Sequence, residues 1–225
     1  MAIGTLNLKS LREQVYDYLK AELKRGALEA GGFLDLKLMA KELGVSRTPL
    51  RDALIQLEVE EFVRISPRRG VSVRTLDERD IREIYQLVGA LEASALLAVA
   101  PRLGAADFQR LRDLDERSRQ AVASGDLDAY YESNYEFHDF FLDRHGNQRM
   151  TALIHLKKHQ LYDWSRKFER PHAQWDRNNI QEHEEIIRLL ETGAFQAAAD
   201  YLRDVHWGFA VQAAFVQEAY FQEPS

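Results

Sequence analysis

Apolar residues recur at spacings of three and four through most of the first sixty residues, which predicts three short helices. The first covers residues 8 to 25, and after the loop GALEAGGF the second runs from about Asp35 to Leu43 and ends before Gly44. The third begins after Ser46, whose hydroxyl is expected to cap it. Its inner face is lined by the apolar residues Leu50, Ala53, Leu54 and Leu57. The order is therefore helix, tight turn, helix.

The pattern then changes to an alternation of period two, which predicts a small β-hairpin. Its apolar positions are Phe62, Val63 and Ile65 before the turn SPRRG, and Val71 and Val73 after it. The stretch LDERD that follows is expected to be a linker, and from about Asp77 onward the helical period returns and predicts about six or seven helices and no strand. We therefore expect two domains, residues 1–76 and 77–225.

Charge divides the chain in the same place. The 225 residues carry a net charge of −6, but residues 1–76 hold 13 Lys and Arg against 10 Asp and Glu, and residues 77–225 hold 17 against 26. A positive first domain favours a polyanionic partner there, although the whole chain is acidic.

Composition excludes several classes of protein. Cysteine is absent, so a disulfide framework, a thiolate zinc site and a cysteine nucleophile are excluded. No uninterrupted apolar run approaches the roughly 18 residues of a spanning helix, and the N-terminal segment is too charged for a signal peptide. We therefore expect a soluble, cytoplasmic protein.

The segment ELGVSRTPLRDAL, residues 42–54, combines the features that a DNA-binding helix-turn-helix requires. Gly44 lies in the turn, and the second helix begins with the polar side chains of Ser46, Arg47, Thr48 and Arg51. Arg47 and Arg51 are one helical turn apart, so they project from the same side and can serve a phosphate or a guanine.

The predicted hairpin adds a basic tip, formed by Arg68, Arg69 and Gly70, which is expected to act as a wing against DNA. The alternative is an ordinary three-helix packing unit with surface arginines. That alternative does not account for a cap, a glycine turn, paired arginines and a basic hairpin in one positively charged segment. The fold class we predict is mainly α, with an N-terminal winged helix-turn-helix followed by an all-α helical bundle.

Residues 10–73 resemble the winged helix-turn-helix of the GntR family of bacterial transcription regulators, through LGVSRTPLRDAL and the wing sequence ISPRRG. Leu50 and Asp52 are conservative departures from the family pattern. The resemblance implies binding to a palindromic operator as a homodimer. The DNA-contacting set is predicted to be Lys37, Ser46, Arg47, Thr48, Arg51, Arg69 and Gly70.

Three histidines of the second domain fall on inward helical stripes. His138 follows Asn134 by four residues on one predicted helix (about 127–144), His183 lies on a second (about 178–191), and His206 on a last helix from about residue 195 onward. Inward imidazoles are costly unless satisfied, and three of them with one oxygen ligand suit zinc or nickel. Hydrogen-bonded core histidines are the alternative. His155 and His159 are expected on the solvated surface, and His145 and His172 at turns.

Residues 80–216 more loosely resemble the FCD effector-binding domain, through NYEFHDFFLDRHGN and EHEEIIRLLETGAFQAAADYL. The resemblance implies a metal site of Asp-x-x-x-His and two later histidines, at Asn134, His138, His183 and His206. Asn134 replaces the aspartate, and His206 comes one residue late, about 100° around an ideal helix, so its ligation needs a local adjustment. The family arginine that grips a carboxylate, four residues before Glu92, is Val88 here.

The sequence thus predicts a transcription regulator, not an enzyme, whose operator affinity is changed by a small-molecule effector in the helical domain, with a divalent transition metal, zinc or nickel, in the site. Two alternatives remain. One is a metal-responsive regulator without an organic effector. The other is a metal-dependent hydrolase, which lacks a general base beside the site and leaves the DNA-reading domain unexplained.

Overall fold

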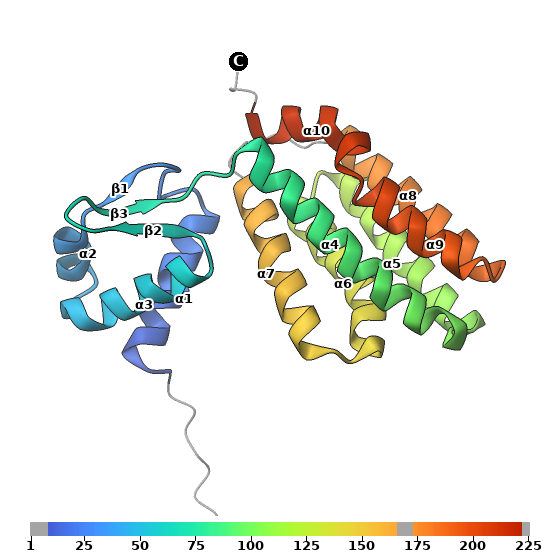
Figure 1. Ribbon diagram of the computed structural model, residues 1–225, viewed down its shortest axis with the longest axis horizontal. Coiled ribbons are helices and arrows are strands. Elements are labelled where there is room, and N and C mark those ends of the chain that lie inside the picture. The colour runs from blue at the N-terminus through green and yellow to red at the C-terminus, as the bar shows by residue number, and fades with distance from the viewer. Residues whose placement is uncertain (1–8, 166–172, 222–225) are drawn as a thin grey trace, which may run out of the picture. The chain divides into compact units, whose positions relative to one another are not determined.

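The computed structural model describes residues 9–165 and 173–221, and the chain divides into two compact units (Figure 1). The N-terminal unit comprises Met1–Asp77 with Tyr162–Lys167, and the C-terminal unit comprises Glu78–Leu161 with Phe168–Ser225. Each unit has its own apolar core.

The N-terminal unit contains three described helices, of which α1 and α3 contribute buried residues to its core. α1 (Leu11–Lys24) begins with a capping box between Ser10 and Glu13, and residue 8, its predicted start, lies outside the described residues. α2 (Leu36–Glu42) is capped by the Asp35 carboxylate. α3 (Arg47–Val59) buries the predicted stripe of Leu50, Ala53, Leu54 and Leu57. Burial of each leucine contributes roughly 1.5–3 kcal/mol, so packing of this stripe fixes the orientation of α3.

A three-stranded antiparallel sheet completes this unit. The predicted hairpin is formed by β2 (Val63–Ser66) and β3 (Gly70–Val73), with Val63 opposite Val73 and both buried. β1 (Phe33–Leu34) pairs with the other edge of β3, giving the order β1-β3-β2. The expectation of a plain loop before α2 was therefore wrong at its end, because a strand of two residues is too short to show an alternating pattern.

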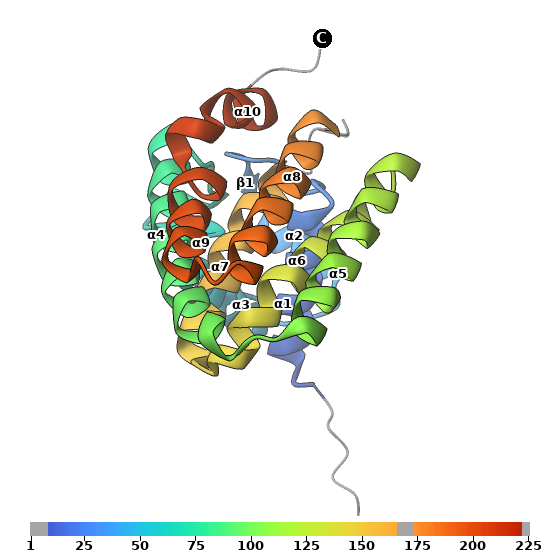
Figure 2. The same ribbon diagram turned by 90° about the vertical axis from the view of Figure 1, so that its right-hand side faces the viewer.

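The C-terminal unit is a helical bundle, and the described residues contain no strand in it (Figure 2). α5 packs against α6 and α8, while α4 packs against α6 and α9. In the described part of the chain, seven α-helices and two short segments follow one another: α4 (Glu78–Val99), η1 (Ala100–Arg102), α5 (Ala105–Ser124), α6 (Leu127–His145), α7 (Gln148–Ser165), α8 (Ala173–Glu191), α9 (Phe195–Tyr201), η2 (Leu202–His206) and α10 (Phe209–Phe221). The end of α7, from Tyr162, is grouped with the N-terminal unit. The predicted linker LDERD is mostly helical, since α4 already begins at Glu78.

One described helix, Glu78–Arg102, is long and apolar enough to cross a membrane by length and composition alone. More than half of its apolar window, 56%, is buried inside the protein. Ile81, Val88 and Leu96 lie on its buried stripe, which is the pattern of a core helix.

The prediction of one continuous last helix was wrong. The backbone widens into a π-helical segment at η2, turns at Trp207 and Gly208, and restarts as α10. A Cβ atom on Gly208 would lie 2.0 Å from the Asp204 carbonyl oxygen, so only glycine fits this turn.

We expect Gly208→Ala to lower the free energy of unfolding by about 1–3 kcal/mol, because the backbone of η2 must move to admit a methyl group. Chemical denaturation of the full-length protein measures this. Gly104→Ala is the matched control, since a Cβ there meets nothing within 4 Å. A comparable loss in both variants would contradict the role of Gly208.

Candidate nucleic-acid interface and metal centre

The turn between α2 and α3 presents the start of α3 to solvent. Gly44 has a φ of +64°, the left-handed conformation that glycine tolerates, and it ends α2 directly before α3 begins. Ser46 is the N-cap residue as predicted, but its hydroxyl makes no capping hydrogen bond, which corrects that expectation. Ser46, Arg47 and Thr48 are all exposed, so the start of α3 is open to solvent, although Pro49 at its third position has no N–H group. Such a helix start is a ready anion site.

All seven predicted DNA-contacting residues are exposed. The cationic side chains among them are those of Lys37, Arg47, Arg51 and Arg69. Across residues 9–165 and 173–221, none of these four forms an ion pair. Several arginines of the C-terminal unit are paired instead, such as Arg112 with Glu191 and Arg117 with Glu136. The uncompensated positive charge is thus on the surface that the sequence assigned to DNA.

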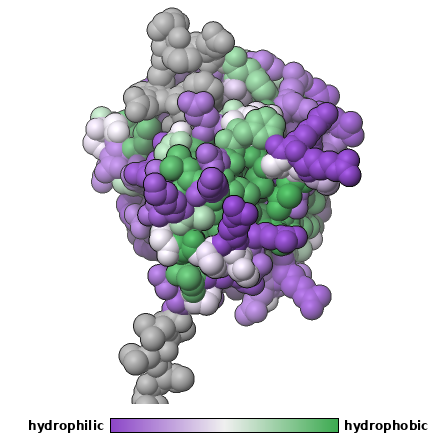
Figure 3. All heavy atoms as spheres, turned by 90° about the vertical axis from the view of Figure 1, so that its left-hand side faces the viewer, coloured by the Kyte–Doolittle hydropathy of each residue, from purple (hydrophilic) through white to green (hydrophobic). Residues whose placement is uncertain are grey.

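The wing lies between β2 and β3. Arg68 and Gly70 both have positive φ, +64° and +102°, which closes a tight turn at the basic tip. Figure 3, which faces the side of the N-terminal unit, shows hydrophilic side chains projecting around a band of apolar surface. Phe33 contributes to the exposed apolar area of this unit, at 69% exposure.

The three inward histidines meet in the C-terminal unit. One nitrogen from each of His138, His183 and His206 lies within 4.8 Å of the others, and all three side chains are buried. The His183 ring stacks on Phe137 with a centroid distance of 3.8 Å, which holds the plane of that imidazole. Asn134, one helical turn before His138, is also buried, at 3% exposure.

The π-helical segment explains how His206 reaches this cluster. A π turn accommodates one more residue than an α turn, so η2 can take up the one residue by which the FCD resemblance places His206 late. The local change in helix geometry that the sequence analysis expected near His206 corresponds to the π-helical segment Leu202–His206. Gly89 on α4 leaves room for the residue that follows His206, because a Cβ atom at position 89 would lie 2.7 Å from the Cβ atom of Trp207.

Three carboxylates behind the histidines were missed by the sequence analysis. Glu92 Oε2 lies 2.7 Å from His138 Nδ1, Glu182 Oε2 lies 2.8 Å from His206 Nδ1, and Asp115 Oδ1 lies 3.3 Å from His183 Nδ1. A detectable signal was present for Glu92, since it falls on the apolar stripe of α4, four residues after Val88. Val88 itself is fully buried.

Glu92 also forms a buried ion pair with Lys158. Lys158 Nζ lies 2.7 Å from Glu92 Oε1, with both side chains excluded from solvent, and the Trp207 indole N–H donates to Glu92 Oε2 at 2.7 Å. Lys158 too has a sequence signal, four residues after the buried Ile154 on α7. Buried charges of this kind are tolerated only when paired.

The electrostatics of the cluster favour neutral imidazoles. Burial lowers the pKa of His138 to about 3 against the opposing pull of Glu92, and it lowers the pKa of His183 well below its ordinary value. Burial raises the pKa of Glu92, but His138 and Lys158 outweigh it and hold that pKa below its usual range. The imidazoles of His138 and His183 are therefore neutral at pH 7, the state that a metal ligand requires.

The histidine nitrogens that face away from the carboxylates decide whether a metal fits. Nε2 of His138 and Nε2 of His183 are buried and have no hydrogen-bond partner among the described residues. An unsatisfied buried group of this kind costs about 1–3 kcal/mol, which a shared cation removes. The donor set therefore fits a nitrogen-preferring divalent ion such as zinc or nickel.

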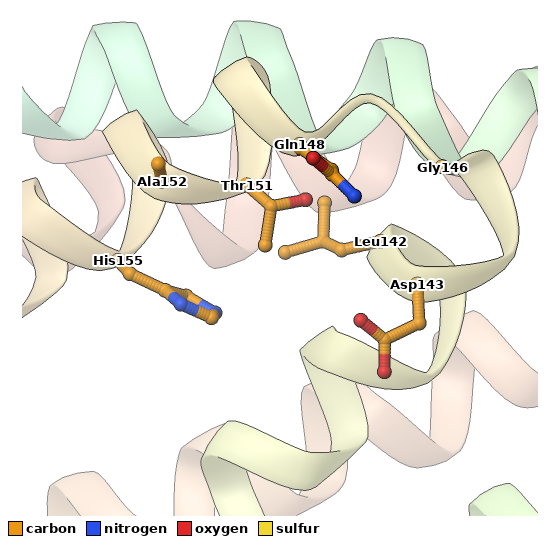
Figure 4. Close-up of a pocket in the computed structure, with 7 residues that line it drawn as sticks. All are labelled: Leu142, Asp143, Gly146, Gln148, Thr151, Ala152 and His155. Atoms are coloured by element: carbon orange, nitrogen blue, oxygen red, sulfur yellow. The ribbon is translucent and has the colours of Figure 1, made fainter. Parts of the chain in front are cut away.

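The remaining histidines take no part in this cluster. His155 was expected on the solvated surface, but it is half-buried and its Nε2 lies 2.6 Å from Asp139 Oδ1, because α6 packs close enough to supply a partner. It lines a cavity of about 360 Å³ between the end of α6 and the start of α7, together with Asp143 and Thr151 (Figure 4). His159 is exposed, His145 ends α6, and His172 lies outside the described residues.

Comparison with known proteins supports both units. Residues 11–73 match the family model of bacterial regulatory proteins, gntR family, and residues 83–205 match that of the FCD domain, more than half of the chain. The chain belongs to the GntR family, in the group with an FCD domain. GntR family members are transcription regulators and not enzymes, so the hydrolase alternative falls.

The relatives of this GntR protein are likewise described as HTH-type transcriptional regulators. The chain is 32% identical over 134 residues to the HTH-type transcriptional regulator McbR of Escherichia coli, covering 60% of the chain and 61% of McbR. It is 30% identical over 145 residues to the HTH-type transcriptional regulator YdhC of Bacillus subtilis, covering 63% of each. The matches thus span about three fifths of the length of these curated relatives.

Solved structures share the fold over nearly the whole chain. E. coli McbR/YncC aligns with a TM-score of 0.69 at 24% identity, over 94% of this chain and 99% of that one. A putative GntR regulator from Rhodococcus sp. RHA1 aligns with a TM-score of 0.72 at 22% identity, over 94% of this chain and 100% of that one. The predicted fold class, a winged helix-turn-helix followed by an all-α bundle, is confirmed.

The buried ion pair between Lys158 and Glu92 is expected to affect the stability of this GntR protein. We expect Lys158→Met to lower the free energy of unfolding by about 3–5 kcal/mol, because it leaves the Glu92 charge without its cation in the core. Denaturation of Lys157→Met, a neighbour on α7 that lies outside this pair, is the control. Equal stability of the two variants would show that the Lys158–Glu92 pair is dispensable.

Proposed function

We propose that the chain is a cytoplasmic transcription regulator that binds a palindromic operator as a homodimer. We further propose that a small-molecule effector, bound in the FCD domain at a site holding a divalent transition metal, changes its operator affinity. The observation that carries the DNA-binding part is the unpaired, exposed positive charge of Arg47, Arg51 and Arg69 around the start of α3 and the wing.

In this proposal α3 enters the major groove with its N-terminus foremost. Backbone N–H groups and the hydroxyls of Ser46 and Thr48 hold phosphates, which fixes register. Arg51, one turn further along α3 than Arg47, reaches a base edge, where a bidentate contact selects guanine. Lys37 on α2 and Arg69 on the wing add phosphate contacts, and Gly70 lets the wing backbone approach closely.

His138, His183 and His206 would hold the metal, with Asn134 as a weak or water-bridged fourth partner. When bound, zinc or nickel supplies a Lewis-acid centre with positions left open to donor atoms of an effector. The three histidines come from α6, α8 and η2, so a ligand bound between them would affect the positions of three elements of the bundle. An effector that prefers one arrangement of the two DNA-binding units lowers the occupancy of the other.

Arg51→Ala is expected to weaken operator binding by about 1–3 kcal/mol if Arg51 reads a base, and the Arg47/Arg51 double alanine variant more so. Gel shifts on a genomic fragment selected by the wild-type protein, repeated at several salt concentrations, measure this. Arg188→Ala, which removes a positive charge paired with Glu185 on α8, is the matched control. Wild-type affinity in the double variant would overturn the assignment.

The homodimer gives a second expectation. Light scattering at micromolar concentration should give twice the 26.0 kDa chain mass, and footprinting should show two half-sites related by a twofold axis. A 26.0 kDa particle both with and without operator DNA would contradict it.

Zinc or nickel should raise the melting temperature of the wild-type protein by mass action, and His183→Ala should abolish the gain. His155→Ala, which lies outside the triad, is the matched control and should keep the full gain. If neither metal stabilises wild type more than His183→Ala, the metal is dropped from the mechanism. An effect of zinc or nickel on operator binding without any added metabolite would instead favour the metal-responsive alternative.

A further inference from the structure

The histidine triad has an unusual distribution of charge. The side chains available as direct ligands are three imidazoles and the neutral amide of Asn134, so the site lacks the carboxylate that the FCD resemblance implies. Negative charge is nevertheless close. A carboxylate lies behind each imidazole, on the side of its Nδ1 atom: Glu92 from α4, Asp115 from α5 and Glu182 from α8.

We infer that Glu92 and Glu182 are positioning residues, which hold His138 and His206 with the proton on Nδ1 and so present Nε2 to a metal. The inference rests on the proposed metal site and deepens it. A carboxylate behind a ligating histidine fixes the tautomer and ring orientation and raises the basicity of the ligand. Here these outer carboxylates take over the electrostatic role of the missing direct carboxylate.

Glu92 is fixed more firmly than the other two carboxylates. Its Oε2 atom lies 2.7 Å from both His138 Nδ1 and Trp207 Nε1, and its Oε1 atom lies 2.7 Å from Lys158 Nζ. Trp207 Nε1 donates a hydrogen bond, while His138 Nδ1 and Lys158 Nζ lie at contact distance without hydrogen-bond geometry. Partners from three different elements therefore restrict the orientation of the carboxylate. A neutral imidazole can donate to Oε2 only from a protonated Nδ1, which leaves the Nε2 lone pair unused and buried.

Glu182 repeats the arrangement without a buried cation. Its Oε2 atom accepts from His206 Nδ1 at 2.8 Å, and its Oε1 atom accepts from the Gln212 amide at 2.8 Å. Asp115 is the weakest of the three, because its oxygen lies 3.3 Å from His183 Nδ1. The geometry thus predicts an order of importance for metal affinity: Glu92 first, Glu182 next and Asp115 last.

The test combines zinc affinity with the histidine tautomer in the full-length protein. Glu92→Gln and Glu182→Gln keep the shape of the side chain but remove its charge, and each should weaken zinc binding 10–100-fold in competition with a chelator. Asp115→Asn should weaken it less. Glu185→Gln, at a half-buried α8 carboxylate paired with Arg188, is the matched control and should bind zinc like wild type.

The tautomer readout needs no metal. In the zinc-free protein labelled with ¹⁵N-histidine, long-range ¹H–¹⁵N spectra should show Nδ1-protonated His138 and His206, with His206 changed in Glu182→Gln and His138 changed in Glu92→Gln. Because Glu92→Gln leaves Lys158 unpaired, a double variant that adds Lys158→Met keeps this arm testable if the single variant unfolds. Glu182→Gln involves no buried cation.

Unchanged tautomers in these variants, or zinc affinity within threefold of wild type, would overturn the inference. Wild type that binds no zinc but shows Nδ1-protonated His138 and His206, both lost in the variants, would instead overturn the proposed metal site and leave the positioning role intact. The two failures are therefore distinguishable.

Discussion

The carboxylate of Glu92 joins four parts of the bundle at a point with no access to water. It comes from α4, and its three partners come from α6, α7 and the turn after η2. A charged group in such a place is stable only while all its partners remain, since each lost contact exposes the full cost of desolvation. The positions of the surrounding helices are thus linked to one another through a polar centre, and this centre touches a histidine of the candidate metal site. An apolar core would tolerate small slides between helices that this network does not.

The two units differ in how their charged side chains are paired. The N-terminal unit leaves its positive charges unpaired and exposed around α3 and the wing, because a polyanion is to supply the missing counter-charge. The C-terminal unit pairs many of its charges internally, on the surface through arginine–carboxylate contacts such as Arg119 with Glu184, and in the core through Lys158 with Glu92. The net charge of −6 for the whole chain does not reveal this difference in charge pairing between the two units.

Much of the fold and of the candidate site could be predicted from the sequence, where a feature depends on local pattern. The α3 stripe beginning at Leu50, the hairpin and the inward direction of His138 all follow from residue spacing. Features that depend on distant partners could not be predicted in this way. β1 exists only because β3 offers it an edge, and Glu92 and Lys158 are 66 positions apart in the printed sequence although their side chains pair. The break at Gly208 was missed because the preceding π segment makes the turn necessary, and spacing rules assume a uniform helix.

The π turn also bears on how such a protein can change over evolution. One residue inserted into an ordinary helix rotates everything after it by about 100° and shifts it by about 1.5 Å, which would scramble a packed interface. Confined to a widened turn, the same insertion leaves the flanking helices in place and alters only the direction of the few side chains inside it. His206 is one of those side chains. Insertion or deletion of a residue in this segment could thus move one ligand of the candidate site during evolution, while the rest of the bundle keeps its packing.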